Sequence, residues 1–233
     1  MTVITLSRQL GSQGHEIAAG VAQRLGLRLV DAATINQAAE RAGVPQVALA
    51  ELQHEGGRGM ANQVLKALQT MPSTVLFATP SGSDKGESRV EGMTTLPFTG
   101  LFSPLVRPIS ASLDGYVRMV GLVIRGLAQE GNVLIAGRGG QILLKDHAHT
   151  LHVQIVAPLA YRVETLMERQ GQDKRTVQNR LRASDRARFD YLRRYHNADW
   201  LDPTLYHMVL NTGKVPVELA VELIIEAQKS VVG

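Results

Sequence analysis

Short apolar runs and longer amphipathic stretches alternate along most of the chain. The apolar runs have the length and composition of buried strands and cover residues 3–6, 27–30, 133–136, 151–156 and 207–210. The amphipathic stretches repeat apolar residues at helical spacing and cover residues 16–25, 34–42, 112–130, 161–170, 173–195 and 217–228. Strands that alternate with helices predict an α/β fold. Its parallel sheet is covered on both faces, and ligands bind beyond the carboxyl ends of the strands.

One long segment breaks this alternation. Residues 72–108 are rich in Pro, Gly, Ser and Thr and have no sustained hydrophobic period. An irregular stretch of this length is typical of a mobile functional loop or of disorder. We therefore expect a single domain over residues 1–233 that carries an irregular insertion at about 56–110.

Composition limits the chemistry and the environment. The chain has 233 residues and no cysteine, so disulfides, zinc thiolates and thiol nucleophiles are excluded. The first residues lack a basic flank followed by a long apolar core, and no apolar run reaches the ~18 residues of a membrane span. We expect a cytoplasmic protein without membrane contact. A net charge of +4 is too small to indicate nucleic acid, and the oligomeric state stays open, with a homodimer as one option.

The stretch "TLSRQLGSQGHE" at residues 5–16 joins the first strand to the first helix. Gly11 and Gly14 would let the backbone approach an anion, and a helix N-terminus offers unpaired amides and partial positive charge. The lysine of the usual phosphate loop is absent, because Gly14 is followed by His15 and Glu16. The side chains left as candidate phosphate ligands are Ser7, Arg8 and Ser12. The alternative is a strand–turn–helix connection without a ligand.

The two residues in the lysine and hydroxyl positions have their own alternatives. His15 would be a weaker and pH-dependent cation if it faces phosphate. Glu16 would repel phosphate directly, but it could also hold a metal or cap the helix.

Two further candidates follow predicted strands. Arg138 lies in the sequence GRGG at residues 137–140, and its planar fork suits a phosphate at the ligand edge of the sheet. The alternative is a glycine-rich turn with a surface arginine. Asp31 ends the second strand and could orient a substrate hydroxyl or a hydrated magnesium ion, or cap the following helix.

The helix predicted at 173–195 is strongly basic and contains Asp185, Arg186 and Arg188. Its charges form a ladder at i,i+3 and i,i+4, which is common on exposed helices. Arginines of this kind could also close over a phosphoryl group and stabilise charge during its transfer. The histidines at positions 147, 149 and 152 lack a clear ligand geometry, so no metal-ligating set is predicted.

Five stretches in this order resemble the cytidylate kinase-like family, a branch of the P-loop nucleoside monophosphate kinases. They are "ITLSRQLGSQGHEIA" at 4–18, "LRLVDAATI" at 27–35, "VLIAGRGGQILL" at 133–144, "APLAYRVETLMERQG" at 157–171 and "SDRARFDYLRRYHNADWLDPTLYHMVLNTGKV" at 184–215. The combination is specific to the family, although no single stretch is.

The resemblance implies a P-loop NTPase-type three-layer sandwich with a substrate-binding insertion and an arginine-bearing lid at about 172–200. It implies transfer of the γ-phosphoryl of ATP, with Mg²⁺, to a nucleoside monophosphate or another small phosphorylated acceptor. The residues that would line the donor nucleotide are Ser7, Gly11, Ser12, Gln13, Gly14, His15 and Glu16. The residues that would act in transfer are Arg8, Arg186 and Arg188, and those that would bind the acceptor are Asp31, Arg138 and Asp185.

Three departures from the family pattern lie at these positions. Gln13 stands where the family more often has Gly, and His15 stands where it often has Arg. Asn36 and Gln37 replace a Tyr-Arg pair of cytidylate kinases that would help to bind the acceptor, so the identity of the acceptor stays open.

Three hypotheses follow. The first is an active ATP-dependent phosphotransferase, in which arginines replace the missing lysine. The second is a nucleotide-binding regulatory module that keeps the kinase fold but transfers weakly or not at all. The third, a nucleic-acid binder that uses the basic helix, is disfavoured because aromatic residues are only 4% of the chain.

Overall fold

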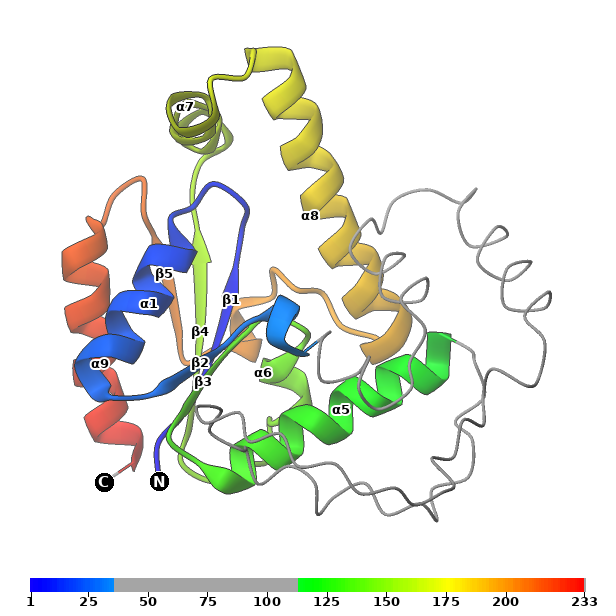
Figure 1. The fold of residues 1–233 in the computed structure, drawn as a ribbon, viewed down its shortest axis with the longest axis vertical. Coiled ribbons are helices and arrows are strands. Elements are labelled where there is room, and N and C mark those ends of the chain that lie inside the picture. The colour runs from blue at the N-terminus through cyan, green and yellow to red at the C-terminus, as the bar shows by residue number, and fades with distance from the viewer. Residues whose placement is uncertain (36–112, 233) are drawn as a thin grey trace, which may run out of the picture.

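The computed structural model describes residues 1–35 and 113–232, which contain a five-stranded sheet (Figure 1). Its strands are β1 (Val3–Arg8), β2 (Arg28–Val30), β3 (Val133–Ala136), β4 (Thr150–Val156) and β5 (Met208–Asn211). They lie in the order β2-β3-β1-β4-β5, and every pairing is parallel. Their carboxyl ends therefore meet at one edge of the sheet, where the loops that follow β1, β2 and β3 converge.

The described helices are α1 (Gly14–Leu25), α5 (Leu113–Glu130), α6 (Gly140–Leu143), α7 (Leu159–Gln170), α8 (Lys174–His196) and α9 (Val217–Val232), with the 3-10 turn η3 at Pro203–Leu205. The α/β fold and its parallel sheet are confirmed, and each strand lies where the hydrophobic pattern predicts it. Residues 32–35 are helical, while the rest of the helix predicted at 34–42 and the insertion at 56–110 lie outside the described residues. None of the described helices combines the length and apolarity needed to cross a bilayer.

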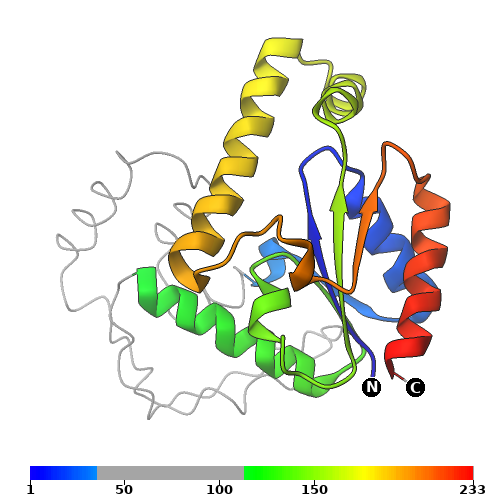
Figure 2. The ribbon, with the colours of Figure 1, turned by 180° about the vertical axis from the view of Figure 1, so that it is seen from behind.

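Helices α1 and α9 cover one face of the sheet (Figures 1 and 2). Side chains alternate between faces along a strand, so Ile4 and Leu6 of β1 point to the same side. Both are buried and pack in one cluster with Val21 of α1 and Ile224 of α9. This apolar contact holds α1, and with it the loop that precedes it, against the centre of the sheet.

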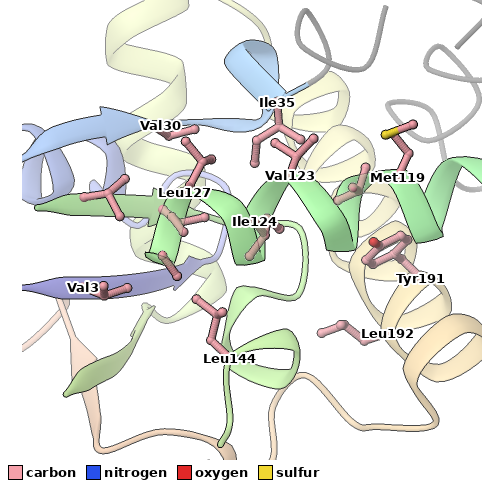
Figure 3. Packing of buried hydrophobic residues seen from close by; sticks show 14 of the residues in the cluster. Val3, Val30, Ile35, Met119, Val123, Ile124, Leu127, Leu144, Tyr191 and Leu192 are labelled. Atoms are coloured by element: carbon pink, nitrogen blue, oxygen red, sulfur yellow. The ribbon is translucent and has the colours of Figure 1, made fainter. Parts of the chain in front are cut away.

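The other face packs against α5, α6 and the C-terminal end of α8. Val3, on the opposite side of β1 from Ile4, joins a cluster that contains Ile124 of α5. Figure 3 shows that this cluster also takes in Tyr191 and Leu192 from α8. The two clusters together make the three-layer arrangement of helices, sheet and helices.

A smaller core lies between α7 and α8, which extend past the carboxyl edge of the sheet (Figures 1 and 2). Val163 and Leu166 of α7 pack there with Val177 and Leu181 of α8, and Leu10 from the β1–α1 loop joins them. The 23 residues of α8 span about 34 Å at the usual helical rise. Helix α8 therefore belongs to the small core at its start and to the sheet core at its end.

Candidate active site

The loop between β1 and α1 has the backbone geometry of an anion site. Gly11 and Gln13 take the left-handed conformation, with φ of 78° and 56°. In the described part of the chain, the amides of Gln13, Gly14, His15 and Glu16 donate no hydrogen bond, and no side chain caps α1. Unbonded amides in a left-handed turn at a helix N-terminus attract an anion, because each contributes a partial positive charge.

Hydrogen bonds from inside the protein fix this loop. Ser12 is fully buried, and its Oγ donates to the Gln9 carbonyl at 2.8 Å. The Gln9 side chain accepts from the Ala157 amide at 2.9 Å, and Thr212 Oγ1 donates to the Ser12 carbonyl at 3.0 Å. The Ser12 hydroxyl is thus engaged within the loop, and a direct contact between this hydroxyl and phosphate stays a prediction.

Arg8, at the carboxyl end of β1, runs between two glycine backbones. A Cβ atom at Gly14 would lie 2.7 Å from the Cβ of Arg8, and a Cβ atom at Gly137 would lie 3.4 Å from its Nη1. Burial lowers the pKa of Arg8, while the charge of Asp31 acts in the opposite direction. The aliphatic part of Arg8 therefore packs on the start of α1, and its partly desolvated guanidinium lies at the turn after β3. No lysine occurs between Arg8 and Leu25.

Asp31 follows β2 and caps the helical turn that starts there. Its Oδ1 accepts from the amide and from the hydroxyl of Thr34, at 2.9 Å each. Partial burial acts to raise the pKa of Asp31, but these hydrogen bonds and the charge of Arg8 outweigh it, so the pKa lies below the usual value. The capping alternative is thus present in the structure, and the carboxylate is ionised and electrostatically coupled to Arg8.

The GRGG sequence forms a tight left-handed turn between β3 and α6. The φ angles of Gly137, Arg138 and Gly139 are 89°, 58° and 71°. A Cβ atom at Gly139 would lie 3.2 Å from Nε2 of His196, so the last turn of α8 packs directly on this turn. Because the turn starts where β3 ends, Arg138 lies at the carboxyl edge predicted for the ligand.

A buried polar network lies beside this turn. Tyr206 OH donates to the Trp200 carbonyl at 2.7 Å and accepts from Nε2 of Gln141 at 3.1 Å. Gln154 Nε2 donates to the same carbonyl at 2.6 Å. Burial raises the pKa of Tyr206 to about 12, and a hydrogen bond with Ser7 acts against the rise. The network fixes the segment after α8 against β1 and β4.

Helix α8 carries the arginines predicted for the lid. Arg186 Nε donates to Asp190 at 2.9 Å, and the two side chains are 69% and 40% exposed. Arg188 donates to the Ser184 carbonyl at 2.9 Å, and its guanidinium lies 5.9 Å from the ring centroid of Trp200. Helix α8 therefore carries one i,i+4 ion pair, between Arg186 and Asp190, while Arg188 bonds to Ser184, so both arginines are engaged in this conformation.

Asp185 contacts a residue that the sequence did not single out. Its two oxygens accept from Nη1 and Nη2 of Arg162, on α7, at 3.0 and 2.8 Å. An arginine on the apolar side of a helix, next to Val163, was the available signal for this buried pair. The sequence analysis also missed Gln141 and Tyr206 of the buried network and Thr212, which bonds to Ser12. No pattern marks them, because most of their hydrogen-bond partners are distant in the sequence.

The two residues in place of the usual Lys and Ser/Thr differ in their surroundings. His15 is exposed. Glu16 forms an ion pair with Arg169 of α7. This pair offsets the repulsion that Glu16 would otherwise exert on a phosphate, and it adds a contact between α1 and α7.

No cluster of three or more His, Asp or Glu side chains that could hold a metal ion occurs among residues 1–35 and 113–232. Mg²⁺ that accompanies a nucleotide usually keeps several waters and needs only one or two protein carboxylates. Asp31 fits that requirement, since it is ionised and lies at the carboxyl edge of the sheet. His152 does not, since it is buried within β4 and bonds to Thr5 at 2.7 Å.

The chain belongs to the cytidylate kinase-like family, whose model matches residues 3–214. The match includes the β1–α1 loop, Asp31, the GRGG turn, α7 and α8. Membership supports a nucleotide kinase-like role and a P-loop type of sandwich.

One solved structure shows the same fold, and another is less similar. An uncharacterized protein from Eubacterium ventriosum superposes with a TM-score of 0.64 at 18% identity, over 99% of both chains. A shikimate kinase from Bacteroides thetaiotaomicron gives a TM-score of 0.48 at 10% identity, over 98% of both chains.

One curated relative is a larger protein. A uronate isomerase from Corynebacterium glutamicum is 30% identical over 97 residues, which are 42% of this chain and 18% of the isomerase. The chain therefore matches less than one fifth of the length of that relative.

Proposed function

We propose that this chain transfers the γ-phosphoryl group of ATP to a nucleoside monophosphate or another small phosphorylated acceptor. The observation that carries the proposal is the set of unbonded amides at the start of α1, against which packs the side chain of Arg8 with its partly desolvated guanidinium. Membership in the cytidylate kinase-like family supports the same role. Such transfer needs positioning and charge neutralisation rather than a covalent intermediate on the protein.

The donor phosphates would bind to the amides of residues 13–16. Gly11 and Gly14 allow close approach, since neither presents a side chain, and Ser12 and Thr212 hold the loop from behind. These amides are fixed before binding, so they need little rearrangement to meet an anion. His15 and Gln13 extend from the same turn and would lie at the rim of the nucleotide.

Arg8 would replace the missing lysine. It starts from β1, on the opposite side of the loop from the lysine position, and reaches the GRGG turn at Gly137. A guanidinium is planar and always charged, and it can contact two oxygens at once. Charge fixed between donor and acceptor phosphates would stabilise the negative charge that builds up during transfer.

Arg138 and Asp31 would serve the acceptor side. Arg138 would hold the acceptor phosphate in its fork, and Asp31 would orient a substrate hydroxyl or water bound to the metal. Mg²⁺ would supply additional charge neutralisation on the phosphates when bound with ATP. Arg186 and Arg188 would close from α8 after leaving Asp190 and Ser184. The exchange is easy for Arg186, since exposed ion pairs are worth only about 0–1 kcal/mol.

ADP release in a coupled assay tests the proposal. The acceptor panel should contain the common nucleoside monophosphates and, because one relative is a uronate isomerase, a phosphorylated and a free hexuronate. In Arg138→Ala we expect kcat/KM for the acceptor to fall roughly 10- to 100-fold, the effect of losing a charge-assisted hydrogen bond. Arg28→Ala, at the opposite edge of the sheet, is the matched control and should retain wild-type kinetics. Unchanged kinetics in Arg138→Ala would refute its assigned role.

The second candidate is a regulatory module that binds nucleotide without transferring phosphate. The absence of a lysine between Arg8 and Leu25 favours it, because oriented charge accounts for much of the rate of such reactions. Calorimetry with ATP and Mg²⁺ separates the two. Binding without turnover on any acceptor of the panel would support the module, whereas robust turnover would eliminate it.

A further inference from the structure

Arg162 is a buried cation between two elements of the candidate site. Its side chain is only 5% exposed, against 28% for its partner Asp185. Its Nη1 also lies 3.4 Å from the Leu10 carbonyl, and its Nε has no hydrogen-bond partner among the described residues. The pair with Asp185 is thus the main compensation for burying this guanidinium, since a charge without partners is costly inside a protein.

The backbone of Arg162 contacts the phosphate loop as well. A Cβ atom at Gly11 would lie 2.9 Å from the Arg162 carbonyl oxygen and 3.0 Å from its Cβ. The loop and the start of α7 therefore touch without space for a side chain. A shift of α7 at this point would move the loop at Gly11, because protein interiors are packed too densely to absorb it.

Neighbouring contacts act in the same direction. Leu10 packs into the small core of α7 and α8, and Tyr161 donates to the Gln13 side chain at 2.7 Å. Glu16, one turn further on, pairs with Arg169. The loop and the first turn of α1 are therefore joined to α7 at several points, and Arg162 extends this connection to α8 through Asp185.

Helix α8 is fixed at its other end by the sheet core, where Tyr191 and Leu192 are buried (Figure 3). Asp185 lies directly before Arg186 and one turn before Arg188. Whatever holds Asp185 thus also sets where these two arginines start from when they approach a phosphate.

We propose that Arg162 is a positioning residue, which fixes the phosphate loop and the arginine-bearing helix α8 relative to each other through its contacts with Leu10, Gly11 and Asp185. The lid is preassembled on the loop instead of hinging freely. In a chain without the phosphate-loop lysine, this arrangement keeps the guanidinium groups of α8 in register with the loop amides. Asp185 acts through Arg162 and not on the acceptor. The consequence for catalysis rests on the proposed function, while the mechanical coupling does not.

Hydrogen exchange on the protein without nucleotide tests the coupling. Three hydrogen-bonded amides can report on it: those of Gln9 and Ser12 in the loop, and that of Ile17 in the first turn of α1, which donates to the Gln13 carbonyl. In Asp185→Asn we expect them to exchange roughly tenfold faster, together with the amides of α8 near position 185, because one partner of a buried pair has been removed. Amides of β4 should keep their wild-type rates. Glu164→Gln removes an exposed carboxylate from α7 and should change none of these rates.

Kinetics provide the second measurement. A mispositioned loop raises KM for ATP, by roughly tenfold in Asp185→Asn, whereas a loss of folded protein lowers only the apparent kcat. Arg162→Lys keeps the charge but loses the two-point contact, and should give an intermediate KM. If Asp185→Asn fails to fold, Arg162→Lys is measured by exchange and kinetics in its place.

Two results would overturn the inference. One is faster exchange in α8 with wild-type exchange at Gln9, Ser12 and Ile17. The other is an unchanged KM for ATP in both variants. If the wild-type protein neither binds nor turns over ATP, the proposed function fails, but the exchange measurement still tests the coupling.

Discussion

Acid should weaken the folded state through His152, a histidine buried in the middle of β4. Its side chain is only 5% exposed in the sheet, where Nδ1 lies 2.7 Å from the Thr5 hydroxyl. The ring centroid also lies 5.1 Å from that of His207, with the two rings tilted, and Nδ1 of His207 accepts from the His152 amide. Burial and then the charges of His207 and His147 lower the pKa of His152 from 6.5 to about 4, although a hydrogen bond to the Leu144 backbone acts in the opposite direction.

The sign of the effect follows from where the proton binds. Between pH 6.5 and 4 the unfolded chain is protonated at position 152 while the folded protein is not, so lowering the pH favours unfolding. Each pKa unit corresponds to about 1.4 kcal/mol. Relative to pH 8, the free energy of unfolding should fall by about 2 kcal/mol at pH 5 and by about 3 kcal/mol at pH 4 from this group alone.

Urea denaturation at half-unit pH steps measures this loss. Other groups also titrate in the window, among them His196, whose pKa is lowered by burial, so the informative quantity is the difference between two proteins. His152→Asn keeps a polar atom near Thr5 and should flatten the pH dependence by the amounts given above. His149→Asn changes an exposed histidine with a left-handed backbone and should keep the wild-type slope. An identical pH dependence in wild type and His152→Asn would refute the reasoning.

Two further predictions concern the loop. Gly14→Ala places a Cβ atom 2.7 Å from that of Arg8, so overpacking should cost roughly 1–3 kcal/mol in urea denaturation and weaken ATP binding in calorimetry. Gly20→Ala on the same helix is the control, because a Cβ atom there meets only the two methyls of Val221, at 3.1 and 3.7 Å. Equal stabilities of the two variants would contradict the crowding argument. Thr212→Val keeps the shape but leaves the buried Ser12 carbonyl without its 3.0 Å partner, which should cost about 1–3 kcal/mol. If the midpoint and the slope of urea denaturation are unchanged in Thr212→Val, this hydrogen bond contributes nothing to the free energy of unfolding.

The strands and most described helices could be predicted from hydrophobic spacing. The run at 133–136 is buried completely as β3, and the end of α1 falls at Leu25, before Gly26 in the left-handed conformation. The pattern did not predict α6, since four residues are too few to establish a helical period. It also placed the start of α7 at 161, two residues late, because Pro158 and Leu159 carry no periodic signal.

The individual residues of the candidate site were harder to predict from the sequence than the strands and helices. Arg8 and Arg138 could be selected because each follows a strand in a sheet whose ligand edge is known from its topology. Asp185 could be selected only as part of a charge ladder, which predicts a partner three or four residues away on the same helix. Its actual partner, Arg162, lies 23 positions away on another helix. The spacing of residues along one helix cannot predict a contact with a different helix.

The sequence by itself determined the strands and most of the helices, that the sheet is parallel, and that a glycine-containing turn with unpaired amides leads into the first helix. These properties follow from the spacing and order of residues along the chain, so they can be predicted from the sequence. Tertiary structure decided which partner each charged side chain meets. Arg8 reaches the turn at Gly137, Glu16 pairs with Arg169, and Arg162 of α7 pairs with Asp185 of α8. The reason is physical, because the strength and sense of an electrostatic contact depend on distance and burial, and both are set only when the layers pack.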